Sequence, residues 1–193
     1  VNDKEEIVDY FGGIEDLERE IIRCVGNPME RFNEDALRMM RAVRFAGQLG
    51  FTIESDTFNA IRTLKANLER VAVERMKVEF EKMILSPHRT LSFKAFVESD
   101  LYHSCPDFKE AKETLLKLGE FLLEKLTITQ AWILFAYYER LSIPQLRKVL
   151  KNWKSSNDQI STILTGCQTL RARLEKEWDA FLAYECPEVL AIE

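Results

Sequence analysis

The sequence predicts an all-α protein, and three observations indicate this class. Apolar residues recur at spacings of three and four along most of the chain, as they do on one face of a helix. Only seven glycines and five prolines interrupt the 193 residues, and several stand where helices would start or stop. Strand patterns are few, the best being Ile7 and Val8 in "EEIVDYFGG", just before a Phe-Gly-Gly turn. We therefore expect a multi-helix fold with at most one strand, at the N-terminus.

The first well-patterned helix is expected in "NEDALRMMRAVRFAGQLG", residues 33–50. Asn33 is a favourable N-cap, and Gly50 is a favourable residue just past a helix end. Between them the apolar residues fall on one face: Ala36, Leu37, Met40, Val43, Ala46 and Leu49. The pattern predicts one continuous helix of roughly sixteen residues.

Further helices are expected after residue 84. Ser86 would be an N-cap with Pro87 at the first helical position, Ser142 would cap "IPQLRKVLKNW", and another helix would start after Ser155 and Ser156. Residues 127–141 are apolar almost all round, which predicts a buried helix. Its aromatic residues are expected in the core: Trp132, Phe135, Tyr137 and Tyr138.

Composition favours a globular protein, with 46% hydrophobic residues and a net charge of −5. No run of eighteen apolar residues occurs, and the N-terminal residues do not resemble a signal peptide, so we expect no membrane span and a cytoplasmic protein. The four cysteines are scattered and there are only two histidines, too few for a zinc site. We expect the cysteines to be small buried residues: Cys24, Cys105, Cys167 and Cys186.

Charge is distributed unevenly along the chain. The first thirty residues are strongly acidic, whereas residues 140–176 are rich in lysine and arginine, with Asp158 and Glu175 as acids among the later cations. A basic surface of this kind could meet RNA phosphates, or it could be a solvated helix face. Charge alone leaves both interpretations open.

Three arginines follow an aspartate at every third residue of the predicted helix: Asp35, then Arg38, Arg41 and Arg44. A step of three residues turns about 300° and rises about 4.5 Å, so the four side chains would form a winding stripe about 13 Å long. Arginine makes forked contacts with phosphate oxygens, and a bound triphosphate would offset the repulsion between the cations. The stripe therefore predicts a nucleoside triphosphate site.

The Asp35 end of the stripe could read a base. An ionised aspartate only accepts hydrogen bonds and an arginine only donates, a pattern that matches the amine and bare ring nitrogen of cytosine and adenine. Uracil and guanine would leave polar groups unpaired, and Glu34 would orient the reading pair. A simpler interpretation also fits, in which the acids favour the helix dipole and Asp35 pairs with Arg38 at i, i+3.

Several blocks resemble one family in order along the chain. They are Asp9, Phe11, Gly12, Gly13, Asp16 and Leu17 in "DYFGGIEDL", then Val25, Gly26 and Pro28, then "RFNEDALRMMRAVRFA", and Glu74, Arg75 and Glu79 in "VERMKVEF". Together they resemble the bacterial CCA-adding enzymes, which are tRNA nucleotidyltransferases, and their poly(A) polymerase relatives. The later segments are more similar to the CCA-adding enzymes of Gram-positive bacteria.

The resemblance implies an enzyme that adds C, C and A to tRNA 3′ ends, with CTP and ATP as substrates and tRNA as partner. Asp35 and Arg38 would select the base, Glu34 would orient them, and Arg41 and Arg44 would help to bind the nucleotide. The chain would comprise a remnant of the head (1–30), the neck (31–86) and the body (87–193). Alternatives are a poly(A)-type relative and a non-catalytic helical RNA-binding module; the oligomeric state is not indicated.

The sequence also departs from the family pattern. The head's paired carboxylates, which hold Mg²⁺ in the family, do not occur here, so no residue of this chain is expected to be catalytic or to bind a metal, and the chain alone should be inactive. Gly47 stands where alanine is common, which we expect to loosen the arginine helix by up to about 1 kcal/mol. "YECPEVLAIE" ends before most of the family's tail, which implies weaker tRNA binding.

Overall fold

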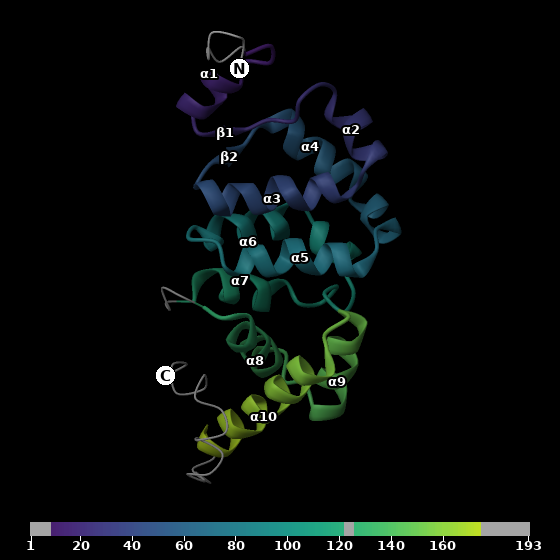
Figure 1. Ribbon diagram of the computed structural model, residues 1–193, viewed down its shortest axis with the longest axis vertical. Coiled ribbons are helices and arrows are strands. Elements are labelled where there is room, and N and C mark those ends of the chain that lie inside the picture. Colours follow the sequence, from purple (N-terminus) through teal and green to yellow (C-terminus); the bar gives the residue numbers. More distant parts are fainter. Residues whose placement is uncertain (1–8, 122–125, 175–193) are drawn as a thin grey trace.

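The computed structural model describes residues 9–121 and 126–174, and it is all-α as expected. Figure 1 shows the helices stacked along the long axis, from α1 and α2 at one end to α9 and α10 at the other. The α-helices are α1 (Gly13–Glu18), α2 (Pro28–Glu34), α3 (Leu37–Leu49), α4 (Ser55–Leu64), α5 (Val73–Ile84), α6 (Arg89–Glu98), α7 (Lys112–Glu120), α8 (Ile128–Tyr138), α9 (Ile143–Asn152) and α10 (Asn157–Leu174). Two 3₁₀ segments, Lys65–Arg70 and Leu101–Ser104, complete the helical elements of the described chain.

Two short strands tie the N-terminal segment to α3. β1 (Ile21–Ile22) pairs in parallel with β2 (Thr52–Ile53), with Ile21 opposite Thr52. The amide of Thr52 donates to the carbonyl of Glu20 at 2.9 Å. The sequence did not predict this pair because two residues are too short to show an alternating pattern. The predicted strand at Ile7 and Val8 lies outside the described residues.

Side-chain caps explain several helix starts. Asn27 accepts from the amide of Met29 and places Pro28 at the first position of α2. Ser142 caps α9 as expected, in a capping box with Gln145, and Ser156 accepts from the amide of Gln159 near the start of α10. The expectation for Ser86 was wrong: α6 begins at Arg89, and the Ser86 hydroxyl donates to the carbonyl of Lys82.

One aromatic core joins the middle and the far end of the molecule. Phe80 of α5 is fully buried, and its ring centroid lies 5.9 Å from that of Trp132 in α8 and 5.1 Å from that of Trp153 after α9. Phe108 lies 4.7 Å from the Trp153 ring. The predicted boundary at residue 86 therefore falls between helices that share a core.

The buried helix expected at residues 127–141 is α8, with Trp132 and Phe135 inside the core. The expectation for Tyr137 was wrong, since 43% of its surface is exposed, and Tyr138 is half-buried. Trp132 and Phe135 lie three residues apart on the inward face, whereas the two tyrosines occupy the last turn.

Gly47 lets α3 and α6 approach closely. A Cβ atom at this position would lie 1.8 Å from the Ser92 hydroxyl and 3.1 Å from the His88 carbonyl oxygen. The Gly47 carbonyl also accepts from the amide of His88 at 3.0 Å. The crossing therefore favours a residue without a side chain, and the expected loosening of the helix by Gly47 stays a prediction.

Within the described residues, no helix has the length and apolar character needed to cross a membrane.

Candidate nucleotide-binding site

The arginine helix begins later than the sequence predicted. Glu34 is the last residue of α2, Asp35 has an extended backbone, and α3 starts at Leu37. The Asp35 carboxylate accepts from the Leu37 amide at 3.1 Å, so it caps α3 from outside the helix. The prediction of one continuous helix from an Asn33 cap was wrong. Asn33 lies inside α2, where its side-chain amide donates to the Met29 carbonyl.

Asp35 and Arg38 each have a different partner. Arg38 Nη1 donates to Glu34 Oε2 at 2.7 Å, and the same nitrogen donates to the Arg31 carbonyl at 2.9 Å. Asp35 Oδ2 accepts from Arg75 Nη2 of α5 at 3.0 Å. The i, i+3 ion pair weighed from the sequence is therefore absent from the described contacts of both residues. Arg38 Nε and Nη2 have no hydrogen-bond partner among the described residues and remain available as donors.

Glu34 orients Arg38 from the preceding helix. Arg31 also donates to Glu34, at 2.8 Å, so two guanidinium groups hold one carboxylate. The hydrogen bond from Arg38 lowers the pKa of Glu34 below its usual range, with the charge of Arg31 adding to the effect. Glu34 is therefore ionised at neutral pH and fixes Arg38 at the α2–α3 junction.

The three predicted arginines do not share one exposed stripe. Arg41 is exposed and has no ion-pair partner among the described residues, whereas Arg44 is 7% exposed. Arg44 Nε lies 2.6 Å from Glu79 Oε2 of α5, and Arg44 Nη1 donates to Gln48 at 2.5 Å. Its guanidinium carbon also lies 4.0 Å from the centroid of the Phe45 ring. Arg44 is thus engaged inside the protein.

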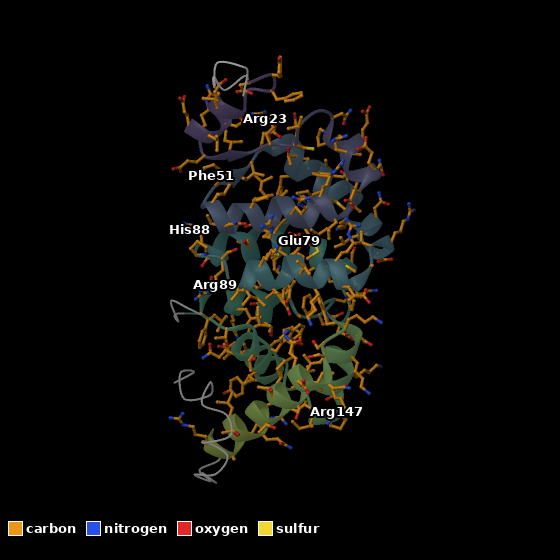
Figure 2. The ribbon with its side chains drawn as sticks, viewed as in Figure 1. Arg23, Phe51, Glu79, His88, Arg89 and Arg147 are labelled. Carbon is orange, nitrogen blue, oxygen red and sulfur yellow. The ribbon has the colours of Figure 1, made fainter. Side chains whose placement is uncertain are left out.

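Helix α5 braces the arginine helix through the Glu74–Glu79 block. Arg75 reaches Asp35 before the first turn of α3, and Glu79 reaches Arg44 further along it. Figure 2 labels Glu79 between α3 and α5. The two motif blocks lie about forty residues apart in sequence, so only the fold reveals that they contact each other.

Arg38 and Arg41 line one pocket of about 260 Å³. Its other walls come from β1 and the residues after it, from α2, from α3 and from α4: Ile22, Arg23, Cys24, Phe32, Ala42, Phe45 and Thr57. The pocket therefore combines three guanidinium groups with an apolar wall. Such a site can hold a phosphate group through forked hydrogen bonds.

Arg23 is the site residue that sequence reasoning missed. Its guanidinium makes a forked contact with Asp16, at 3.0 and 3.1 Å, and lies 3.9 Å from Glu54. The hydrogen bond that Arg23 donates to Asp16 raises the pKa of Arg23. Figure 2 labels Arg23 at the α1 end of the molecule. Asp16 was noted in the sequence as part of the "DYFGGIEDL" block, and its partner seven residues later was the available signal.

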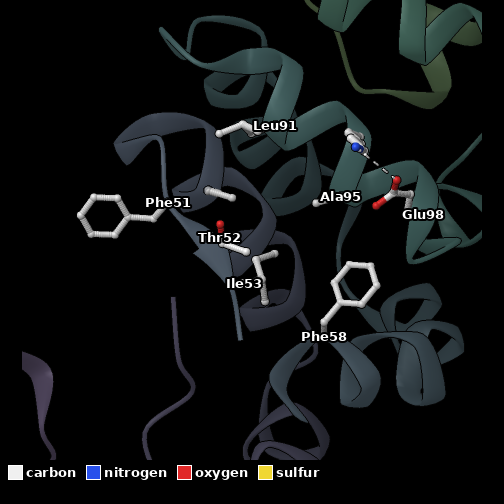
Figure 3. A pocket seen from close by; sticks show the side chains of 9 residues that line it. Phe51, Thr52, Ile53, Phe58, Leu91, Ala95 and Glu98 are labelled. Atoms are coloured by element: carbon white, nitrogen blue, oxygen red, sulfur yellow. Dashed lines mark ion pairs between the residues drawn. The ribbon is translucent and has the colours of Figure 1, made fainter. Parts of the chain in front are cut away.

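Two other hollows lack this chemistry. Figure 3 shows a hollow of about 360 Å³ bordered by Phe51, Ile53, Phe58 and Leu91, where the cation Lys94 is paired with Glu98 at 3.8 Å. A larger space of about 620 Å³ beside α6 and α7 mixes Arg62 and Lys112 with Asp100 and Glu120. The Arg38–Arg41 pocket differs from both because its lining contains three arginines and no aspartate or glutamate.

The described residues contain no cluster of three or more histidine, cysteine or acidic side chains that could hold a metal ion. Cys105 and Cys167 are buried as expected, and burial raises the pKa of both thiols. Cys24 is only partly buried beside the pocket, and Cys186 lies outside the described residues. Among the described residues, the pocket is therefore lined by cations, and no candidate metal cluster accompanies it.

Two family models match the chain. Residues 50–112 match "Probable RNA and SrmB- binding site of polymerase A", and residues 124–192 match "tRNA nucleotidyltransferase domain 2 putative". Both regions are downstream of the α2–α3 junction.

Curated relatives carry the name CCA-adding enzyme. The protein of Enterococcus faecalis is 42% identical over 188 residues, which cover 97% of this chain and 46% of the relative. That of Anoxybacillus flavithermus is 42% identical over 186 residues, with 96% and 46% covered. The chain therefore spans about half the length of the relatives it matches.

A solved structure of a CCA-adding enzyme has a similar fold. The Bacillus stearothermophilus CCA-adding enzyme, crystallised in complex with CTP, superposes with a TM-score of 0.85 at 30% identity. The match covers 96% of this chain and 47% of that protein. A tRNA-processing enzyme solved with CTP shares the fold at 19% identity, with a TM-score of 0.70.

Proposed function

Because the chain belongs to the CCA-adding enzyme family, we propose that it forms the part of such an enzyme that selects CTP or ATP and positions tRNA. The observation that carries this proposal is the α2–α3 junction. There Asp35 offers acceptors and Arg38 offers two donors without a partner, beside a pocket that holds Arg41 and Arg23. The whole enzyme would add C, C and A to tRNA 3′ ends.

Base selection would follow from the fixed polarity of this pair. Cytosine and adenine present an amine beside an unprotonated ring nitrogen, so Asp35 would accept from the amine and Arg38 would donate to the ring nitrogen. Uracil and guanine present a carbonyl beside an N–H group, which would oppose acceptor to acceptor and donor to donor. A mismatch of this kind is rejected strongly because it leaves desolvated polar groups unpaired.

The phosphates would lie toward Arg41. This side chain is exposed, without an ion-pair partner in the described chain, and lines the pocket together with Arg38. Arg44 is also a predicted nucleotide-binding residue. Its buried pair with Glu79 supports an indirect contribution, through the position of α3, to the site that Arg38 and Arg41 form. Mg²⁺, which the family uses for transfer, would be held by carboxylates other than those described here.

The experiment that tests base selection is nucleotide incorporation by the full-length enzyme into tRNA that lacks its 3′ end. Asp35→Asn keeps an oxygen for the Leu37 amide, replaces one acceptor with a donor and removes the charge that pairs with Arg75, so UTP and GTP should enter more often. Arg75→Gln is the matched control, because it removes the same ion pair without altering the base-reading atoms. Equal loss of selectivity in both variants would attribute the effect to the ion pair and contradict the proposal.

A poly(A)-type activity is the second candidate. The family model that matches residues 50–112 has a description that names polymerase A. The same assay distinguishes the two. A poly(A)-type enzyme would extend RNA with ATP and would not insert CTP, whereas the proposed enzyme inserts both.

A further inference from the structure

The acid-free stretch of the chain with the most cations surrounds α9. Residues 140–157 contain five cations and no aspartate or glutamate, in a chain whose net charge is −5. Four of the five follow one another at short spacing: Arg147, Lys148, Lys151 and Lys154. We call these four residues the α9 ridge.

The ridge is the outer side of a helix whose inner side is fixed in the core. Leu146, Val149, Leu150 and Trp153 are buried, whereas all four ridge residues are exposed. At 100° per residue, Arg147 and Lys151 fall about 40° apart around α9 and about 6 Å apart along its axis. Trp153 Nε1 donates to the Pro106 carbonyl at 2.9 Å and holds the end of the ridge in place.

Lys154 is held at the end of the ridge by a turn. Its backbone is left-handed, with φ at 54°, and its amide donates to the Lys151 carbonyl at 3.0 Å. The ridge therefore continues two residues beyond Asn152, the last helical residue, on a backbone that this hydrogen bond holds.

No ridge residue has an ion-pair partner in the described part of the chain, unlike Lys77, Lys94 and Arg19, which pair with Glu81, Glu98 and Glu15. The acid that comes near, Asp107, is occupied by the side-chain amide of Asn152 at 2.9 Å. Helix-dipole stabilisation accounts for Lys151 in the last turn of α9, but not for Arg147 and Lys148 before that turn or for Lys154 beyond the helix. Cations in a row that face solvent without acids match the regular negative charge of a phosphate backbone.

We propose that the α9 ridge binds the phosphate backbone of RNA. The proposal rests on the proposed function for its ligand, the tRNA to which nucleotides are added. Figure 1 places α9 below α5 and α3 above it, so the ridge would grip the RNA at a distance from the Arg38–Arg41 pocket. Its contribution is electrostatic and independent of base sequence, because phosphate contacts carry no sequence information.

The test uses the full-length enzyme and tRNA that lacks its 3′ end, with the affinity measured over a range of salt concentrations. In the variant R147Q/K151Q/K154Q, the slope of log affinity against log salt should fall by about one for each cation removed. Affinity for CTP and ATP, measured by calorimetry without RNA, should stay unchanged. The melting temperature should also stay unchanged.

A single-charge comparison removes the effect of net charge. Lys151→Gln and Arg19→Gln change the net charge equally, but Arg19 is paired with Glu15 in α1 and outside the ridge. Only Lys151→Gln should weaken tRNA binding, and Lys151→Arg should preserve it.

Two results would overturn the inference. One is an unchanged salt slope in the triple variant, and the other is equal weakening by Arg19→Gln. If the unmodified enzyme bound CTP and ATP but no tRNA, both the ridge and the tRNA part of the proposed function would fall. The ridge variants could instead weaken the binding of an acidic peptide and leave tRNA binding unchanged. That result would indicate a protein partner and refute the RNA assignment.

Discussion

At the residue scale, Arg41 and Arg44 differ sharply although both belong to the same sequence pattern. Arg41 faces solvent, whereas Arg44 and Glu79 are each 7% exposed and paired with each other. The spacing of three residues predicts neighbours on a winding stripe, and it does not say which of them the fold covers. Burial of this pair is decided by α5, which is distant in sequence.

Arg44→Ala should therefore lower the free energy of unfolding, by about 3–5 kcal/mol, because it leaves the Glu79 carboxylate buried without a counter-charge. Urea denaturation of the full-length enzyme measures this loss. The double variant Arg44→Met with Glu79→Gln should recover part of it. A variant Arg44→Ala that unfolds like the unmodified enzyme, yet loses nucleotide affinity, would argue for a direct phosphate contact.

Arg41→Ala should weaken the binding of CTP and ATP by similar factors and leave stability unchanged. Its side chain is exposed, and phosphate contacts are common to both nucleotides. Calorimetric titration of each nucleotide measures the ratio. A change in preference between CTP and ATP would contradict the assignment of Arg41 to the phosphates.

The Glu34–Arg38 pair predicts the pH range of base selection. The Arg38 hydrogen bond lowers the pKa of Glu34 from its ordinary 4.5, so the pair's contribution is present above that value and is lost as the pH falls through the lowered pKa. Nucleotide selectivity in equilibrium binding should therefore be constant between about pH 6 and 8. Selectivity could instead change near neutral pH in both the unmodified enzyme and the Glu34→Gln variant. That result would show that a group other than Glu34 titrates and controls selectivity.

At the element scale, the helix crossing of α3 and α6 depends on Gly47. Gly47→Ala should destabilise the protein by about 1–3 kcal/mol, because the added methyl group would overlap Ser92. Thermal denaturation checks this prediction. Gly13→Ala is a suitable control, since its nearest atom would be 3.8 Å away, and adding Ser92→Gly to Gly47→Ala should restore much of the stability. If Gly47→Ala has the same melting temperature as Gly13→Ala, α3 and α6 can move apart with little loss of folding free energy.

Sequence patterns predicted those elements that depend on contacts between residues close together in the sequence. The sequence predicted the Ser142 and Ser156 caps and the almost wholly apolar helix α8, because each depends on residues within a few positions. The break between α2 and α3 was not readable, since both Asn33 and Asp35 are good caps. The structure chooses Asp35, whose carboxylate also contacts Arg75 from α5.

At the scale of the whole molecule, Phe80 connects regions that two separate family models describe. It lies in the residues matched by the first model and packs on Trp132 and Trp153, which lie in the second. The all-α class was predictable from pattern and resemblance, and a nucleotide site near Asp35 stays a prediction. The pocket wall that contains Arg23 was not, because the parallel pairing of β1 with β2 brings it there.

This shared core predicts that the two regions unfold together. Differential scanning calorimetry of the full-length enzyme should show one transition for both regions, and Phe80→Ala should lower its temperature by removing about 3–5 kcal/mol of stability. Separate transitions for the two regions in the unmodified enzyme would contradict a common core.

The packing of Trp132 and Trp153 against Phe80 also determines what the fluorescence of these two residues can report; the third tryptophan, Trp178, lies outside the described residues. Both indoles are shielded from water, so their fluorescence is a gauge of core integrity, and unfolding should shift it to longer wavelength. Neither indole lines the Arg38–Arg41 pocket, whereas Phe45 does. A tryptophan introduced at Phe45 would give that pocket an optical signal of its own, measured as the difference from the fluorescence of the unmodified protein.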